Sequence, residues 1–387
     1  MTPEQNRNTM DCDAISEAFL SLHAQDGFSR LPPSSLLHDS VPMSFVMSAG
    51  LIQVENDLEK IVEQTGGKFA FTQPCFRHFD MKQVGTDPTR LSLFHMSAAF
   101  HIGCSERETV LPRLWHFLTD VLGLEKERLW VTYLDDGEFG RDEASYRCWR
   151  ELGVDTSRLV GLDQEHCFWR QRSTGQIASD GKKCGPHTEV FYERPEVVCA
   201  ACENREKAPG TCRCGRFVEI SNSLFIENYI GDDGKLIPAE TVFAECVLGL
   251  ERVEMVLREL PSVYHAHRFS TWQEQLSDIG VTSAGYTTQK DIHTIFDHLY
   301  AFLKLTADGA PAPGKGGRKY IMRKLAREAM ERTEDNHWDT LKFLALVASD
   351  QPTALEHLLE EYQRFIKNRR TQTQQKSNKQ HRMVKTI

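Results

Sequence analysis

Hydrophobic residues follow two different spacings in the first two thirds of the chain. The stretch "AISEAFLSLHAQDGF" has apolar residues three and four positions apart, which predicts an amphipathic helix ending at Gly27. Similar helical patterns occur in "VENDLEKIVEQTGG", "RETVLPRLWHFLTDVLG" and "DEASYRCWRELG". Between them lie short apolar runs bounded by turn residues, as in strands: "MSFVMSAG", "FAFTQPCFRHF", "RLSLFHMSAAFHIG" and "RLWVTYL". We therefore expect an α+β fold with a mostly antiparallel sheet.

The pattern changes in the last third of the chain. "FAECVLGLERVEMVLREL" begins as a strand and becomes helical near Gly249, and helical patterns dominate after about residue 260. They are interrupted by "TADGAPAPGKGG", which is rich in helix-breaking Pro and Gly. We expect an α+β domain over residues 1–258, a helical domain over 259–366 and a flexible basic tail over 367–387.

Composition narrows the class of protein. Of 387 residues, 40% are hydrophobic and 26% are charged, which is ordinary for a globular protein. No apolar run reaches the roughly 18 residues of a membrane helix, and the polar N-terminus does not resemble a signal peptide. We therefore expect a cytoplasmic protein without membrane contact, whose eleven cysteines are reduced thiols or metal ligands.

The formal net charge of -9 argues against a chain that binds nucleic acid over its whole surface. Basic residues are nevertheless concentrated in two places. From Arg364 to Ile387 there is no acidic residue, and "GKGGRKYIMRKLAR" is a second basic cluster. Both suit a phosphate backbone, with a solvated tail and an ordinary helix face as the alternative.

Four cysteines fall within sixteen positions: Cys199, Cys202, Cys212 and Cys214. The spacing supplies four thiolates to one tetrahedral Zn²⁺, which would be structural because no ligand position stays open. The alternative is a set of free core thiols. The cluster forms an insertion, residues 199–214, between the strand-like segments "CGPHTEVFYE" and "FVEISNSLF".

Three arginines are candidates for phosphate binding. Arg77 and Arg90 lie on neighbouring hairpin-like strands, and Arg252 lies where a strand becomes a helix. Guanidinium groups pair bidentately with phosphate and stabilise charge during phosphoryl displacement. Each arginine alone is an ordinary surface residue, so the interpretation depends on the set.

The segments that hold these residues resemble the alanyl-tRNA synthetase family, from about Ala14 to about Ile366. The resemblance rests on "AFLSLHAQDGFSRLPPSSLL", "FVMSAGLIQ", "QPCFRHFD…VGTDPTRLSLFHMSAAFHIG", "CGPHTEVFYE", "VEISNSLFIENY", "VLGLERV" and "DHLYAFLKLTADGAPAPGKGGRKYIMRKLARE", in family order. It implies the class II antiparallel sheet flanked by helices, a catalytic domain over 1–258 and a tRNA-recognition domain over 259–366. The resemblance covers the catalytic and tRNA-recognition regions and not the family's editing and C-terminal domains, so we expect an editing-free ligase.

The resemblance implies activation of an amino acid by ATP and Mg²⁺, followed by transfer to a tRNA acceptor stem. Arg77, Arg90 and Arg252 then match the residues that bind ATP. Trp169 matches the aromatic wall of the amino-acid pocket, and Asn222 and Glu245 match the anchors of its α-amino group. The expected cofactors are ATP, Mg²⁺ and, in the cysteine cluster, Zn²⁺.

The sequence departs from the family pattern around this pocket. His95 stands where the family has a glutamate, Val247 where it has a glycine, and Glu245 replaces an aspartate. Several such changes together can move specificity, so we expect alanine or another small amino acid as the substrate.

For the tRNA, the resemblance implies phosphate contacts from four basic residues: Arg318, Lys319, Arg323 and Lys324. The asparagine that reads a G·U pair in the family falls at Gly317. Loss of this reader leaves room for a second hypothesis, an adenylate-forming enzyme that delivers the aminoacyl group to a carrier protein or a small-molecule amine. A third, an inactive paralogue, is disfavoured by the retained arginines and by Asn222.

Overall fold

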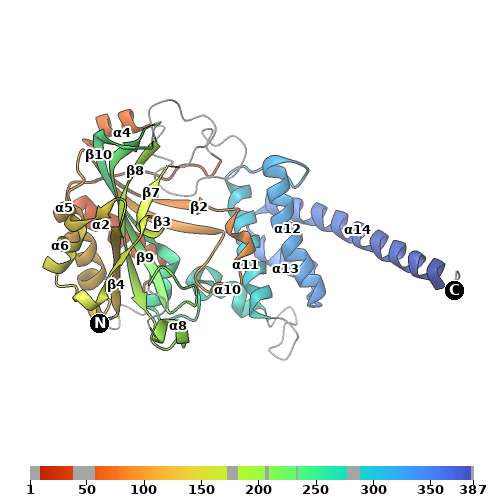
Figure 1. The fold of residues 1–387 in the computed structure, drawn as a ribbon. Coiled ribbons are helices and arrows are strands. Elements are labelled where there is room, and N and C mark those ends of the chain that lie inside the picture. Colours follow the sequence, from red (N-terminus) through yellow and green to blue (C-terminus); the bar gives the residue numbers. More distant parts are fainter. Residues whose placement is uncertain are drawn as a thin grey trace.

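The structure is a computed structural model that describes residues 9–37, 57–171, 182–204, 209–231, 234–276 and 288–384. The predicted strand at residues 43–50 lies outside these ranges, as does the whole "FVMSAGLIQ" segment. The sheet forms one end of the molecule, a group of helices packs at its side, and the C-terminal helix projects from that group (Figure 1).

One sheet organises the N-terminal two thirds of the chain. Within the described residues its strands run in the order β1-β2-β3-β10-β9-β8-β4-β5, with β6 beside β4 and β7 beside β8. Only β1–β2 and β4–β6 are parallel pairs among these strands, so the predicted antiparallel α+β fold is confirmed. The strands are β1 (Ser29–Arg30), β2 (Lys68–Phe76), β3 (Leu93–Ile102), β4 (Leu129–Asp136), β5 (Gly140–Arg141), β6 (Leu159–Leu162), β7 (Phe168–Arg170), β8 (Lys182–Glu193), β9 (Phe217–Ile230) and β10 (Leu236–Gly249).

Helices cover one face of this sheet and form the C-terminal region. The α-helices are α2 (Cys12–Gln25), α4 (Leu58–Thr65), α5 (Arg107–His116), α6 (Glu143–Glu151), α7 (Gln164–Cys167), α8 (Ala200–Glu203), α9 (Leu250–Leu257), α10 (His267–Gln275), α11 (Gln289–Ala307), α12 (Gly317–Asp335), α13 (Thr340–Val347) and α14 (Pro352–Val384). Short 3-10 turns occupy Asp80–Lys82, Lys126–Arg128, Thr156–Arg158 and Val263–His265, and a π-helical turn occupies Phe117–Val121. No helix in the described ranges is both long and apolar enough to cross a membrane.

Alternation along the strands gives the sheet two different faces. On β10, Ala244, Cys246 and Leu248 belong to the large apolar cluster formed with the helices. Val247 belongs to a smaller cluster on the opposite face, together with Phe71 and other residues of β2, β3 and β9. Because side chains alternate at every residue of a strand, residues 245, 247 and 249 all point away from the helices.

The helical region shares its core with the sheet domain. Leu91 before β3, Leu250 of α9 and Phe296 of α11 are all buried members of the same large apolar cluster. The expected boundary at residue 258 therefore separates two patterns in the sequence, but the packing is continuous across it.

The C-terminal tail differs from our expectation. Helix α14 continues across residue 366 to Val384, where we expected a flexible tail over 367–387. The segment contains no Gly or Pro and is rich in Arg, Lys and Gln, which are good helix formers. Intrinsic propensity extends a helix that the preceding residues have started.

Candidate active site

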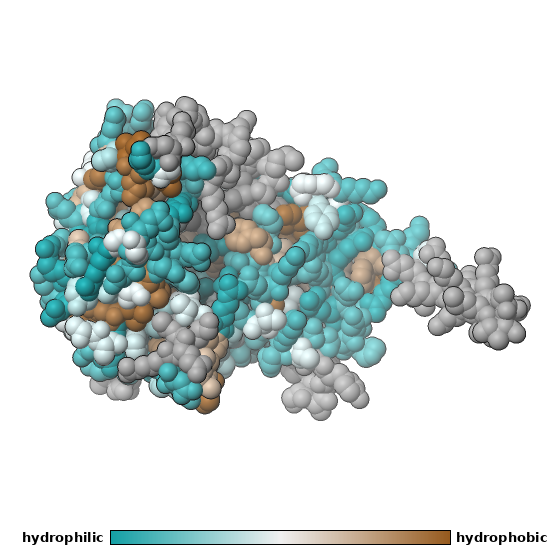
Figure 2. Space-filling model, in the orientation of Figure 1, coloured by the Kyte–Doolittle hydropathy of each residue, from teal (hydrophilic) through white to brown (hydrophobic). Residues whose placement is uncertain are grey.

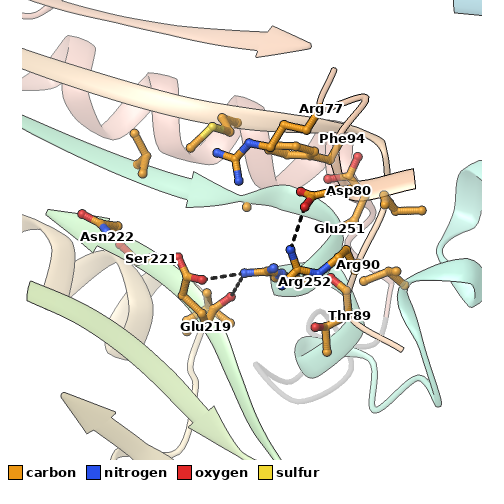
Figure 3. Close-up of a pocket in the computed structure, with 16 residues that line it drawn as sticks. Arg77, Asp80, Thr89, Arg90, Phe94, Glu219, Ser221, Asn222, Glu251 and Arg252 are labelled. Atoms are coloured by element: carbon orange, nitrogen blue, oxygen red, sulfur yellow. Dashed lines mark hydrogen bonds and ion pairs between the residues drawn. The ribbon is translucent and has the colours of Figure 1, made fainter. Parts of the chain in front are cut away.

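A pocket lies on the face of the sheet that the helices leave uncovered. Figure 3 shows side chains from β3, β9, β10, α9 and the segment between β2 and β3 converging on it. It is lined by Arg77, Asp80, Thr89, Arg90, Leu91, Phe94, Met96, Glu219, Ile220, Ser221, Asn222, Val247, Gly249, Glu251, Arg252 and Val263. All three arginines of the sequence analysis are in this set, with Asn222 and Val247.

Arg252 is held at the start of α9 by three contacts. Its Nε donates to the carbonyl of Thr89 (3.0 Å), and its Nη1 donates to the carbonyl and carboxylate of Glu219 (3.2 and 2.9 Å). A Cβ on the neighbouring Gly249 would meet only Arg252 Cδ, at 3.8 Å, within 4 Å. Protein packing therefore does not require a glycine there, and the space it leaves is open to a ligand.

The other two arginines also line this space, and Figure 3 shows Arg77 across it from Arg252. The guanidinium of Arg77 lies over the ring of Phe94, 4.8 Å from its centre. Arg90 is held by Asp80, with Nη1 and Oδ1 3.0 Å apart, and by Asp87 at 3.4 Å. The contact with the Phe94 ring and these ion pairs hold the two guanidinium groups before any ligand arrives, as a site for a phosphate chain requires.

The segment from Arg77 to Ser92, which we call the arginine segment, is held by residues distant in sequence. The Tyr264 hydroxyl donates to the carbonyl of Arg90 (2.6 Å), and the Val263 amide donates to that of Pro88 (3.0 Å). Gly85 has a φ of +78°, and a Cβ there would lie 2.6 Å from the Lys290 carbonyl of α11. Only glycine fits this approach of the segment to the helical region.

Asn222 and Val247 are direct neighbours on β9 and β10. The next residue of β10 on the same face is Glu245, which is buried and paired across the strands with Leu224. Asn222 donates from Nδ2 to Oε1 of Glu189 on β8, at 3.2 Å. Burial, followed by the charge of nearby Glu219, raises the pKa of Glu189 well above its usual value.

Trp169 does not line the pocket itself. It lies half-buried on β7, paired with Gly185, and packs against the apolar cluster that contains Val247. Glu245, Val247 and Trp169 thus share one face of the sheet, and of these three residues Val247 lines the pocket.

His95 lies elsewhere, contrary to our expectation. We expected it in the substrate pocket, but Phe94 and Met96, on either side of it in β3, line that pocket. Strand alternation directs His95 to the helix-covered face, where its Nδ1 lies 3.0 Å from Glu251 and 2.7 Å from Arg268 Nη1. Burial and the charge of Arg268 lower the pKa of His95.

Glu251 connects this network to the pocket that it lines. It pairs with Arg268 at 2.5 Å and accepts the His95 backbone N–H at 3.0 Å. Burial opposes ionisation of Glu251, but Arg268 and His95 outweigh it and lower the pKa of the carboxyl to about 2. Glu251 is therefore a fixed anion under the pocket floor.

The four cysteines of the insertion come together. The sulfurs of Cys199 and Cys212 are 3.8 Å apart, those of Cys202 and Cys214 3.6 Å, and all four lie within 4.8 Å of one another. A tetrahedral Zn²⁺ with Zn–S bonds of about 2.3 Å sets its sulfurs about 3.8 Å apart. The two short pairs match this spacing, so the donor set suits a tetrahedral zinc.

The cysteine insertion also contacts the arginine segment. Arg213 donates from Nη1 to Oε1 of Gln83 at 3.0 Å, and a Cβ on Gly215 would lie 2.9 Å from the Pro88 ring. The insertion thus supports the segment at Gln83 and Pro88, in addition to the contact of α11 at Gly85.

The four basic residues expected to meet tRNA lie in the first turns of α12. Lys319 is exposed, and Arg318, Arg323 and Lys324 are half-buried. Arg323 lies 5.6 Å from the ring centre of Tyr320, and Lys324 Nζ lies 3.7 Å from Glu328. The face of the helical region seen in Figure 2 is mainly hydrophilic.

Comparison with known proteins identifies the family. Residues 14–387 match the profile described as "tRNA synthetases class II (A)", which is almost the whole chain. The chain belongs to this class II synthetase family.

Curated relatives of this class II synthetase include two alanine–tRNA ligases. The one from Dehalococcoides mccartyi (strain BAV1) is 29% identical over 323 residues, which cover 82% of this chain and 35% of that protein. The one from Thermotoga maritima is 31% identical over 326 residues, covering 83% of this chain and 36% of that protein. The chain therefore spans about a third of the length of these relatives.

Similar solved structures include two synthetases. The apo histidyl-tRNA synthetase of S. aureus has 12% identity and a TM-score of 0.37, with 69% of this chain and 76% of that one covered. A pyrrolysyl-tRNA synthetase of Desulfitobacterium hafniense has 10% identity and a TM-score of 0.33, with 65% and 70% covered.

Several pocket residues of this class II synthetase escaped the sequence analysis. Phe94 and Asp80 lie within the same motif as the arginines, so the alternation of β3 and the nearby arginine could have indicated them. Glu219 and Glu189 reach the site from β9 and β8, and only strand register brings them there.

Proposed function

We propose that this chain activates a small amino acid, alanine or a relative, with ATP and transfers it to tRNA. The observation that carries the proposal is the convergence of Arg77, Arg90 and Arg252 on one pocket beside Asn222 and Val247, in a chain of the class II synthetase family.

In the first step the amino-acid carboxylate attacks the α-phosphorus of ATP and pyrophosphate leaves, which gives an aminoacyl-adenylate. In the second a tRNA ribose hydroxyl attacks the activated carbonyl, loses its proton and releases AMP. Arg77, Arg90 and Arg252 are positioned to neutralise phosphate charge in the first step. No covalent bond to the enzyme forms, so position and charge supply the rate.

Mg²⁺ bound with ATP would neutralise the charge of the phosphates and orient the leaving pyrophosphate. Mg²⁺ prefers carboxylate and phosphate oxygens. Glu219, whose side chain is 38% exposed and lines the pocket, supplies such an oxygen once phosphate takes over its contact with Arg252.

For the amino acid, we assign Asn222 and Glu245 to its ammonium group and Trp169 and Val247 to its side chain. Glu245 is buried, which strengthens its attraction for a cation. Val247 is bulkier than glycine and narrows the space for the side chain, so the substrate is small.

We further propose that Cys199, Cys202, Cys212 and Cys214 hold one structural Zn²⁺. The short sulfur–sulfur distances support this assignment. The metal would keep the insertion folded against Gln83 of the arginine segment.

As the acceptor we propose a tRNA whose phosphates meet the basic first turns of α12. Gly317, at the position of the family's G·U-reading asparagine, favours the second candidate acceptor, a carrier protein or a small-molecule amine.

Amino-acid-dependent exchange of pyrophosphate into ATP tests the activation step, run across the common small amino acids. Charging of total tRNA with the activated amino acid then tests the acceptor. If the protein exchanges pyrophosphate and charges tRNA, the acceptor is tRNA. If it exchanges pyrophosphate but neither charges tRNA nor binds it at low salt, the second acceptor class is supported. Absence of exchange with every amino acid would refute the proposed activity.

A further inference from the structure

Ser92 joins the two arginines of the arginine segment. Its carbonyl accepts the backbone N–H of Arg77 (2.7 Å), and it lies two residues after Arg90. Its own N–H and hydroxyl both donate to Asp297 of α11, at 2.6 and 2.5 Å. Ser92 is fully buried and Asp297 almost so, so these bonds do not compete with water.

The next residue along α11 extends this contact. His298, also fully buried, has Nδ1 2.9 Å from Asp297 Oδ2 and Nε2 3.0 Å from Glu328 Oε2 of α12. An ionised carboxylate only accepts hydrogen bonds, so both ring nitrogens must donate, and the imidazole carries a positive charge. Glu328 in turn lies 3.7 Å from Lys324.

We propose that the chain Ser92–Asp297–His298–Glu328 positions Arg77 and Arg90 for the phosphates of ATP. This inference rests on the proposed function. The residues act through Ser92 and do not touch the substrate, so they are positioning residues.

The chemistry of the chain fits this role better than a purely packing role. Buried ion pairs add little stability compared with apolar side chains of similar size, because desolvating the charges costs as much as their attraction returns. Their directional bonds, however, fix geometry. Here the two bonds of Asp297 reach Ser92, 205 residues away in sequence, in the segment that carries both arginines.

The charge state of His298 agrees with this geometry. Burial alone would lower its pKa, but the hydrogen bonds with Asp297 and Glu328 outweigh burial and raise the pKa of the imidazole. Burial likewise opposes ionisation of Glu328, but its bond to His298 lowers the pKa of that carboxyl.

Two variants test the chain. Asp297→Asn keeps the shape but removes the charge, and His298→Gln removes the charge between the two carboxylates. For each variant we would measure the KM for ATP and the KM for the amino acid in pyrophosphate exchange. We expect the KM for ATP to rise about tenfold and the KM for the amino acid to stay within about twofold. The control is His23→Gln, because His23 is buried on α2 and its Nδ1 bonds to the Phe19 carbonyl of the same helix; it should change neither KM.

Equal changes in both KM values, or an unchanged KM for ATP in a folded variant, would overturn the proposal. Ser92→Ala, which keeps the backbone bond to Asp297, provides a milder test if the charge variants fail to fold. The double variant Ser92→Ala/Asp297→Asn should have the same KM for ATP as Asp297→Asn, because both residues belong to one hydrogen-bond chain. Two independent effects would instead add and raise the KM for ATP further.

The proposed function can fail separately. If the wild-type protein exchanges pyrophosphate with no amino acid, ATP binding measured by calorimetry replaces the KM. Weaker ATP binding by Asp297→Asn than by His23→Gln would then support the positioning role of the hydrogen-bond chain, although the proposed activity is refuted. Equal ATP binding by the two variants would refute the positioning role as well.

Discussion

Replacement of Arg252 is the most direct test of the pocket. In the structure its guanidinium uses two nitrogens for three bonds, to the Thr89 carbonyl and to the carbonyl and carboxylate of Glu219. Arg252→Ala removes a positioned cation from the pocket. Loss of one preorganised donor to developing charge costs about 2.7–4 kcal/mol, which is a factor of about 10²–10³ in rate.

The fold should survive this change. Glu219, the carboxylate left behind, is 38% exposed and stays hydrated, so little stability should be lost. Arg252→Lys keeps the charge, but its single nitrogen cannot make bonds in both directions. We expect about 100-fold or more loss of pyrophosphate exchange for Arg252→Ala and an intermediate loss for Arg252→Lys, with unfolding temperatures near that of the wild type.

The matched control is Arg258→Lys at the end of the same helix. Arg258 pairs with Glu254 at 2.6 Å and does not line the pocket, so exchange should stay within about twofold. Exchange by Arg252→Ala within about threefold of the wild type would show that Arg252 does not act on the nucleotide and would refute the assignment.

Three further outcomes are expected. Cys212→Ser should lower both the zinc content, from one ion per chain, and the unfolding temperature, because a structural zinc contributes to folding; equal zinc in parent and variant by elemental analysis would contradict the site. Glu245→Gln should raise the KM for the amino acid about tenfold with little effect on that for ATP, because only the ammonium anchor is lost; an unchanged amino-acid KM would place the anchor elsewhere. Burial lowers the pKa of His293 to about 4, below its unfolded value of about 6.5. The stability contributed by the neutral imidazole is therefore present above about pH 6.5 and lost as the pH falls toward 4. Denaturant titrations should find a smaller loss of stability with falling pH in His293→Gln.

The fold could be predicted from the sequence where one pattern changed into another. Strand β10 ends at Gly249 and α9 begins at Leu250, where the apolar spacing changes in the sequence. Cys199 and Cys214 lie close together, as expected from their spacing. Local patterns sufficed in these places because the partners are near in sequence.

Other features depended on contacts that no local pattern contains. His95 was expected in the pocket because a resemblance gives a residue's position in a motif but not the face of the strand to which its side chain points. Its neighbours Phe94 and Met96 line the pocket, so alternation along the strand places His95 on the other face. In the sequence, Asp297 and His298 are polar residues within an apolar helical pattern. Ser92, the hydrogen-bond partner of Asp297, could not be identified without the tertiary structure.

The cysteine insertion and the helical region both support the arginine segment. This support affects how the enzyme could be re-engineered. The hydrogen bonds from Tyr264 to Arg90 and from Ser92 to Asp297 both join residues on the two sides of residue 258. Exchanging the helical region for another acceptor-binding module would therefore remove them. A graft made at that boundary would thus carry an impaired nucleotide site into the chimera. Swapped modules would have to retain α11 and the turn before α10, with only the surface of α12 and α14 replaced.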